Sequence, residues 1–171
     1  MIVRAAVAGD GDAIWSIMEP TIRAGDTYAL PPDWSRADAL TYWRSPGHSV
    51  FVAEDGGTVV GTYYMRPNQR GGGDHVANCA FMTAAGATRR GVATAMCAHA
   101  LEHAAASGYD AMQFNFVVST NARAVALWRR FGFEIVGRLP GAFRHPALGP
   151  VDALVMYRRL DRDSPVMPAA G

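Results

Sequence analysis

The residues best suited to chemistry form one short segment, Thr88–Thr94, which reads TRRGVAT. Two consecutive arginines precede a glycine and an alanine, and an Ala- and Met-rich stretch typical of a helix follows. Small side chains leave the N–H groups of a first helical turn accessible, and the helix dipole attracts anions there. Guanidinium groups add charge-assisted hydrogen bonds. The segment therefore predicts a phosphate-binding loop, with a solvated helix start as the alternative.

Two asparagines, Asn78 in VANCAF and Asn115 in QFNFVV, interrupt apolar runs typical of buried strands. Strand alternation predicts Phe114 and Phe116 on one face and Asn115 on the other. A buried amide needs a hydrogen-bond partner, so each asparagine either satisfies backbone groups of a distorted sheet or contacts a polar ligand. An amide can orient an amine or a carboxylate without competing for its proton.

Histidines and cysteines offer weaker signals. His99 and His103 have a spacing that suits a pair of metal ligands, but no third ligand accompanies them in the sequence pattern, and we predict no metal. His75 follows three glycines and Asp74 at a predicted strand entrance, which favours a surface histidine. The two cysteines, Cys79 and Cys97, lie in apolar segments without C-x-x-C spacing, which predicts reduced, buried thiols and a cytoplasmic location.

Charge and hydropathy limit the partners. The 16 basic residues are all arginines, and 15 acidic residues leave a net charge of +1. This balance argues against a nucleic-acid module, and the missing lysine excludes Schiff-base and P-loop lysine chemistry. The sequence contains no apolar run long enough to span a bilayer and no signal-peptide core near its start, so we expect no membrane partner.

The elements that must position these residues follow from periodicity and turn signals. We expect strands over Ile2–Arg4, Ser49–Glu54, Thr58–Arg66, Val76–Thr83, Ala111–Ser119, Glu134–Leu139 and Asp152–Leu160. We expect helices from Asp10 or Asp12 to Pro20 and over Arg36–Arg44, Gly91–Ser107 and Asn121–Phe131, with a Pro/Gly-rich loop before the last strand. The interval 84–110 is long enough for the helical crossover of a parallel strand pair. The pattern predicts one α/β domain with a mixed sheet.

Two segments resemble the GCN5-related N-acetyltransferase (GNAT) superfamily. Thr88–Ala93 is similar to its Gln/Arg-x-x-Gly-x-Gly/Ala motif, with Thr88 at the first position, and Asn121–Phe133 is similar to its N-x-x-A-x-x-x-Y/W-x-x-x-G-F segment. The resemblance extends over nearly the whole chain. It implies an N-acetyltransferase domain over 1–162 with a tail over 163–171, and helices flanking a mixed sheet whose fourth and fifth strands splay around acetyl-CoA.

The resemblance also implies the cofactor contacts, which lie on the fourth strand, on the phosphate loop with the start of the helix after it, and on the helix Asn121–Phe131. They are Phe81, Met82, Thr83, Thr88, Arg89, Arg90, Gly91, Val92, Ala93, Thr94, Asn121 and Trp128. Trp128 stands where many members of the superfamily have a tyrosine that gives the last proton, so the proton donor to the thiolate stays unassigned. A homodimer is usual for such proteins and is expected here.

Three further segments, Gly61–Asn68, His75–Asn78 and Phe114–Asn121, resemble the azetidine-2-carboxylate acetyltransferase branch. That likeness implies Asn78 and Asn115 as catalytic residues that orient the acceptor, and we expect Tyr28 and Tyr64 as pocket walls. The predicted activity is direct N-acetylation of a small amine, amino acid or imino acid. The alternatives are acetylation of a protein N-terminus or lysine, and a non-catalytic acyl-CoA sensor.

Overall fold

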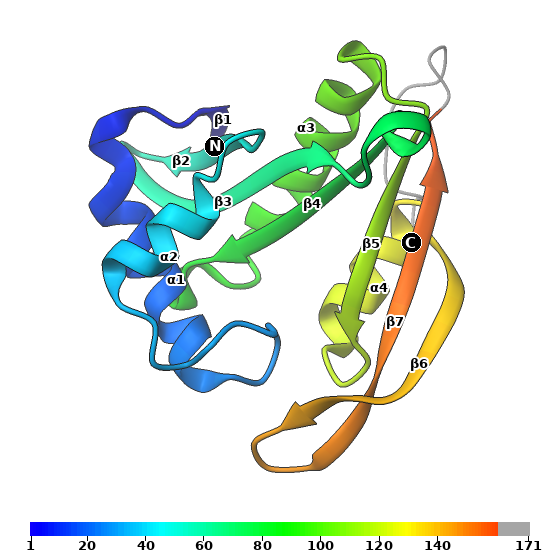
Figure 1. The fold of residues 1–171 in the computed structure, drawn as a ribbon. Helices are drawn as coiled ribbons and strands as arrows, with labels where there is room; N and C mark the ends of the chain where they lie inside the picture. The colour runs from blue at the N-terminus through cyan, green and yellow to red at the C-terminus, as the bar shows by residue number, and fades with distance from the viewer. Residues whose placement is uncertain (161–171) are drawn as a thin grey trace.

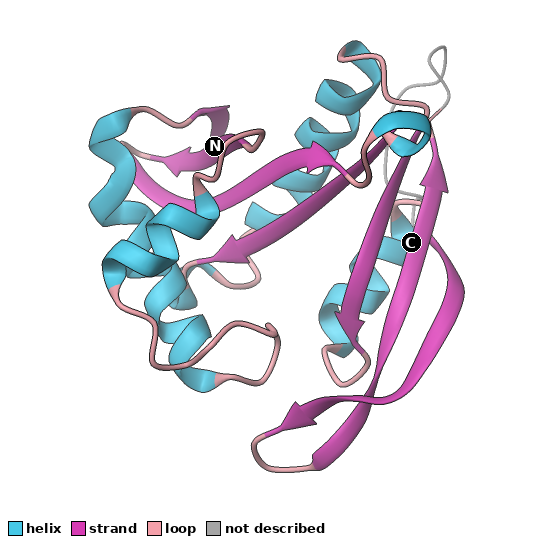
Figure 2. Cartoon of the chain, viewed as in Figure 1, coloured by secondary structure: helices cyan, strands magenta, loops and turns pink. Residues whose placement is uncertain are grey.

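The computed structural model describes residues 1–160, which fold into a single twisted sheet flanked by helices (Figure 2). The strands are β1 (Ile2–Ala5), β2 (Ser49–Asp55), β3 (Thr58–Pro67), β4 (Val76–Thr83), β5 (Ala111–Val118), β6 (Glu134–His145) and β7 (Gly149–Arg159). The helices are α1 (Gly11–Ala24), α2 (Arg36–Trp43), α3 (Val92–Ala106) and α4 (Ala122–Arg130), with short 3₁₀ turns η1 (Ala8–Asp10), η2 (Gly71–Gly73) and η3 (Ala85–Ala87).

The sheet has the order β1-β2-β3-β4-β5-β7-β6, and β4 and β5 form its parallel pair. That pair is short: only Val76 with Ala111 and Ala77 with Met112 are in register. Beyond this point the two strands diverge (Figure 1). The predicted mixed sheet with splayed fourth and fifth strands is thus confirmed.

Each face of the sheet has its own apolar core. On one face α3 packs against the sheet through Met96 and Leu101, both fully buried. On the other face α1 and α2 pack through Ile14, Met18 and Trp43, which are also fully buried. The two layers hold β4 from both sides, because its side chains alternate between the two cores.

The prediction that the first helix ends at Pro20 was wrong, because α1 continues to Ala24. An interior proline removes one helical hydrogen bond at a cost of about 3 kcal/mol. Burial of Ile22, which is 1% exposed, stabilises the turn of helix that follows Pro20 and offsets this cost. The helix ends at Gly25, whose backbone adopts the left-handed region with φ +61°.

The last hairpin was also predicted with the wrong boundaries. β6 runs to His145 instead of ending at Leu139, and β7 begins at Gly149. The residues Pro140 and Gly141 lie in a register shift within β6, and the turn follows His145. Because β6 is the edge strand, a proline there does not interrupt hydrogen bonds on both sides.

A second register shift changes the predicted faces of β5. Between Phe114 and Val117 the strand bulges against β7. Phe114 is 4% exposed and lies in the core with Val117 packed against it, whereas Phe116 is 38% exposed, so the predicted alternation that puts Phe114 and Phe116 on one face breaks at the bulge. The predicted domain end at 162 and the tail over 163–171 lie outside the described residues. Within the part of the chain that the structure describes, no helix is long and apolar enough to cross a membrane.

Candidate active site

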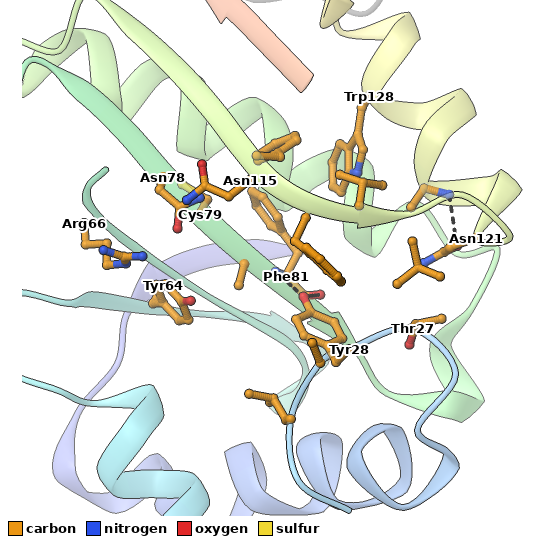
Figure 3. Close-up of a pocket in the computed structure, with 18 of the residues that line it drawn as sticks. Thr27, Tyr28, Tyr64, Arg66, Asn78, Cys79, Phe81, Asn115, Asn121 and Trp128 are labelled. Atoms are coloured by element: carbon orange, nitrogen blue, oxygen red, sulfur yellow. Dashed lines mark hydrogen bonds between the residues drawn. The ribbon is translucent and has the colours of Figure 1, made fainter. Parts of the chain in front are cut away.

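Two adjoining cavities lie where β4 and β5 diverge. The amide pocket, about 250 Å³, is bordered by Tyr64, Asn78 and Asn115 (Figure 3). The loop pocket, about 430 Å³, is bordered by Thr88–Arg89 and by the first turn of α3. The cavities share six lining residues, which therefore mark their junction: Thr27, Tyr28, Phe81, Asn121, Ala124 and Trp128.

Most predicted cofactor residues line the loop pocket. They are Phe81, Met82, Thr83, Thr88, Arg89, Gly91, Val92, Ala93, Thr94, Asn121 and Trp128. Arg90 is the exception, because its guanidinium forms an ion pair with Asp55 at the β2–β3 turn. The structure therefore places Arg90 away from the loop pocket.

The start of α3 has the features of an anion site. Gly91, its N-cap residue, has φ +79°, a left-handed conformation that side chains disfavour, and a Cβ built there would meet no atom within 4 Å. No side chain caps the helix and no acidic residue occupies its first turn. Arg89 also adopts a positive φ, of 66°. The first-turn N–H groups thus face open space beside an arginine, which fits a phosphate group.

Charge in the loop pocket is one-sided. Its charged lining residues are Arg89 and Arg123, and within residues 1–160 neither is paired with an acidic side chain. The sequence analysis missed Arg123. Its position could have pointed to it, because Arg123 lies in the first turn of α4, two residues after the predicted cofactor contact Asn121. The pocket carries a positive field that attracts an anionic ligand.

Asn78 is 7% exposed and links the two diverging strands. Its Nδ2 donates to the carbonyl of Gln113 on β5 at 2.9 Å, just beyond the last register pair. Its Oδ1 has no hydrogen-bond partner among the described residues and belongs to a side chain that lines the amide pocket. Asn78 therefore satisfies backbone at the divergence and still offers an acceptor oxygen.

Asn115 sits in the middle of a row of amides. Its Nδ2 donates to Oδ1 of Asn68 at 2.7 Å, and its Oδ1 accepts from Nε2 of Gln113 at 2.8 Å. The row fixes the orientation of the Asn115 amide at the wall of the amide pocket. The structure thus brings Asn78 and Asn115 together, as predicted, and shows internal partners for both.

Tyr28 lies at the junction of the cavities, with its hydroxyl on β4. The hydroxyl donates to the Phe81 carbonyl at 2.5 Å and accepts from the Phe81 N–H at 2.9 Å (Figure 3). Phe81 is one of the backbone positions predicted to hydrogen-bond the cofactor. In this structure both of its backbone groups are engaged by Tyr28. Burial raises the pKa of the Tyr28 hydroxyl, which keeps it protonated at neutral pH.

Tyr64 closes the other side of the amide pocket. Its hydroxyl lies 3.2 Å from that of Tyr42, and its ring stacks on His48 with centroids 4.1 Å apart. Burial raises the pKa of Tyr64 and, with Arg66 nearby, lowers the pKa of His48. Trp128 is 8% exposed and packs on Phe81 with ring centroids 5.1 Å apart, so it serves the core as well as the junction.

The histidine and cysteine predictions have clear outcomes. Cys79 and Cys97 are free and buried, as predicted, and burial raises the pKa of both thiols. His75 is exposed. The rings of His99 and His103 stack with centroids 6.0 Å apart, and Nδ1 of His99 contacts the Tyr63 hydroxyl at 2.6 Å. Within residues 1–160, no three His, Cys, Asp or Glu side chains are grouped to hold a metal ion.

Comparisons with known proteins agree with this architecture. The model of the Acetyltransferase (GNAT) family matches residues 13–133. A GCN5-related N-acetyltransferase from Kribbella flavida shares 42% identity, with 93% of this chain and 97% of that chain covered at a TM-score of 0.89. A phosphinothricin acetyltransferase from Sinorhizobium meliloti, solved in complex with AcCoA, shares 21% identity over 99% of this chain and 94% of that chain, with a TM-score of 0.83.

Among curated proteins, the N-acetyltransferase aca1 of Schizosaccharomyces pombe is 28% identical over 87 residues. The match takes in 51% of this chain and 42% of that protein, so it spans less than half of the relative's length. A seven-stranded sheet that splays beside a helix N-terminus defines an acetyltransferase-type α/β fold. The family match extends from the first turn of α1 through α4 and includes the phosphate loop and both splayed strands. The chain belongs to the GNAT acetyltransferase family.

Proposed function

We propose that the protein transfers an acetyl group from acetyl-CoA directly to the nitrogen of a small amine, amino acid or imino acid. The observation that carries this proposal is the junction of the two cavities at Tyr28, Phe81 and Trp128. One cavity is suited to an anion and the other presents neutral amides. A ligand with phosphates and an acceptor with a nucleophilic nitrogen would therefore meet at one place.

The loop pocket supplies the anion-binding half. First-turn N–H groups of Val92, Ala93 and Thr94 lie beside Arg89, so pyrophosphate oxygens would receive both backbone and guanidinium hydrogen bonds. Acetyl-CoA, when bound, supplies the acetyl group as a thioester. The aromatic side chains of Phe81 and Trp128 would exclude water from the junction, because both pack tightly there.

The amide pocket supplies the acceptor half. The Asn78 Oδ1 atom is available to accept an N–H from the incoming amine, and the fixed Asn115 amide forms the adjacent wall. Holding the nitrogen lone pair toward the junction lowers the entropic cost of the reaction. These residues are the catalytic residues of the proposal. The chemical class of acceptor follows the likeness of this chain to the azetidine-2-carboxylate acetyltransferase branch.

Thiol release decides the proposal. Acetyl-CoA, the thiol reagent DTNB and a panel of amino acids, imino acids, polyamines and peptides would be incubated with the protein. Release of CoA thiol with an amino or imino acid supports the proposal. Tight acetyl-CoA binding by calorimetry without thiol release from any acceptor would favour a sensor domain, and release only with peptides would favour acetylation of proteins.

Three accompanying proposals are a homodimer, which the resemblance implies, a cytoplasmic location, which the two free cysteines favour, and acetyl transfer without a metal, because His99 and His103 lack a third ligand in the sequence pattern. Light scattering coupled to size exclusion tests the first, fractionation of the producing cells tests the second, and thiol release in the presence of EDTA tests the third. A monomer at micromolar concentration, a non-cytoplasmic fraction or loss of activity in EDTA would contradict the respective proposal.

A further inference from the structure

Arg66 is the charged residue of the amide pocket. The other lining residues are neutral tyrosines, amides, small polar residues and apolar side chains, and neither an acidic residue nor a second arginine borders this cavity within residues 1–160. An arginine keeps its charge at all physiological pH values. The pocket therefore presents one fixed positive charge to whatever enters it.

The guanidinium of Arg66 has no ionic partner among the described residues. The group makes one long hydrogen bond among the described residues, 3.4 Å from Nη1 to the carbonyl of the next residue, Pro67. Several other arginines of the chain form ion pairs, such as Arg4 with Asp10 at 2.8 Å and Arg138 with Asp152 at 2.6 Å. Several N–H donors of Arg66 are thus available to a ligand.

The strand register fixes where Arg66 lies. It pairs with Asn78 across β3 and β4, and Tyr64, two residues earlier, points to the same face. Figure 3 shows Arg66 at the end of the pocket near Asn78 and Tyr64, with Asn121 and Thr27 at the other end. The junction with the loop pocket lies on the side of Tyr28 and Trp128, so Arg66 stands at the opposite end of the pocket from the junction, where the proposed function would bring the thioester.

We propose that Arg66 binds a carboxylate of the acceptor, so that the substrate class of this pocket is a carboxylate-bearing amine rather than a neutral amine or a polyamine. This inference rests on the proposed acetylation of a small acceptor in the amide pocket. Arg66 holds the carboxylate by charge-assisted, bidentate hydrogen bonds, and the amine then extends past Asn78 toward the junction. A polyamine or a lysine side chain meets an unneutralised positive charge and is disfavoured.

A surface hollow also adjoins Arg66. It is bordered by Pro46–His48 and Pro67–Arg70, and Arg66 lines both the hollow and the amide pocket. Arg66 therefore faces a hollow of the surface as well as the amide pocket, and entry of the acceptor from this side is part of the proposal. Arg70 borders the hollow but not the amide pocket, which makes it a matched control for loss of one positive charge.

The test compares azetidine-2-carboxylate and the standard amino acids with their carboxamides, in wild type, Arg66→Gln, Arg66→Lys and Arg70→Gln. Two measurements are made, namely kcat/KM by thiol release and binding of each acid to the CoA-loaded protein by calorimetry. We expect wild type to prefer an acid over its amide, and Arg66→Gln to lose about 10- to 100-fold for the acid alone, chiefly in KM. Arg66→Lys should recover part of this loss, and Arg70→Gln should behave as wild type.

The outcomes separate the two proposals. If Arg66→Gln leaves the preference for acid over amide unchanged, or if wild type has none, the assignment of Arg66 is overturned. If no acceptor is acetylated but an acid binds and Arg66→Gln abolishes that binding, the carboxylate site stands and the proposed reaction fails. If wild type neither binds nor acetylates any acid of the panel, the assignment of Arg66 is overturned, and the proposed reaction fails as well only if no carboxamide, polyamine or other small amine is acetylated.

Discussion

Arg89 and Arg90 are neighbours in the chain with opposite surroundings. Arg89 lines the loop pocket beside the start of α3, whereas Arg90 is held by Asp55 at the β2–β3 turn. From the sequence alone, both arginines were predicted to contact phosphate. Their difference arises from the direction of the backbone, which turns through a left-handed conformation at Arg89.

Substitution of these arginines separates binding from charge alone. Arg89→Ala should reduce the binding free energy of CoA by about 1.5–3 kcal/mol, the range for a lost charge-assisted hydrogen bond. Arg90→Ala should leave the affinity for CoA near that of wild type. Calorimetry with CoA and dephospho-CoA checks this, and a larger effect of Arg89→Ala on CoA would place the side chain at the 3′-phosphate. Equal losses in both variants would contradict the structural distinction.

Asn115 tests whether the pocket amides act on the acceptor. Asn115→Ala should lower kcat/KM for the acceptor by about 100-fold or more, with acetyl-CoA affinity unchanged, because a preorganised polar contact near the reacting centre is lost. Asn68→Ala is the matched control, since it breaks the same 2.7 Å hydrogen bond without removing an amide from the pocket. Thermal melting is measured beside the kinetics of both variants.

A purely structural role makes a different prediction. If Asn115 only satisfies its neighbours, both variants lose similar stability, about 1–3 kcal/mol, and keep wild-type kcat/KM per folded molecule. That result would remove Asn115 from the catalytic residues. Asn78→Ala should lose stability as well as activity, because it also removes the bond to the Gln113 carbonyl that links β4 to β5.

At the scale of elements, the connection between α1 and α2 lies against β4 through Tyr28. It carries Tyr28 across to the Phe81 backbone, at the place where the cofactor is proposed to bind. A ligand that hydrogen-bonds Phe81 must first displace the Tyr28 hydroxyl. The sequence indicated Tyr28 as a pocket wall, but only the folded connection shows that its hydroxyl occupies the Phe81 backbone groups that the family resemblance assigned to the cofactor.

Removal of that hydroxyl should therefore strengthen cofactor binding. Tyr28→Phe is expected to lower the Kd for acetyl-CoA about 5- to 150-fold, since two hydrogen bonds with a net value of about 0.5–1.5 kcal/mol each no longer have to be displaced. Tyr42→Phe is the control, because its hydroxyl lies against Tyr64 in the same pocket and not against β4. Weaker acetyl-CoA binding by Tyr28→Phe would show instead that the hydroxyl contacts the cofactor.

The wrong element boundaries share one physical cause. Pro20 and Pro140 are local signals for the end of a helix or a strand. Both elements nevertheless continue past the proline, because the residues that follow are packed or paired. Burial of Ile22 extends α1, and pairing of Phe143 with Val151 extends β6 beyond its bulge. Single-sequence patterns cannot weigh such distant contacts against a local penalty.

At the scale of the whole molecule, the sequence predicted the order of elements and the parallel crossover, because turn signals and the length of 84–110 are local. The divergence of β4 and β5 was implied only by family resemblance, since nothing in either strand's alternation shows that pairing stops after Ala77. Arg66 was missed for a related reason. Its partner Asn78 and its pocket exist only once β3 and β4 are in register.

The two cavities together contain few groups that titrate near neutral pH. No Asp, Glu or His lines either cavity within residues 1–160. Burial raises the pKa values of Tyr28, Tyr64 and Cys79, so all three stay protonated at pH 7. His48 stacks on Tyr64 from the outer hollow, and burial followed by the charge of Arg66 lowers its pKa. The pocket thus offers no evident base with a pKa near 7 to an incoming ammonium group.

This electrostatic arrangement predicts the pH dependence of the proposed reaction. Only the neutral amine attacks a thioester, and below the amine pKa its fraction rises tenfold per pH unit. Without a pocket base, kcat/KM for the acceptor should rise with a slope near 1 across neutral pH and level off only near the pKa of the acceptor's own amine, which in a free amino or imino acid lies above that of a peptide α-amino group because of the adjacent carboxylate. Initial rates from pH 6 to 10 at saturating acetyl-CoA check this. A plateau already present at pH 6.5 would mean that a group of lowered pKa accepts the proton, and loss of that plateau in His48→Asn would identify it.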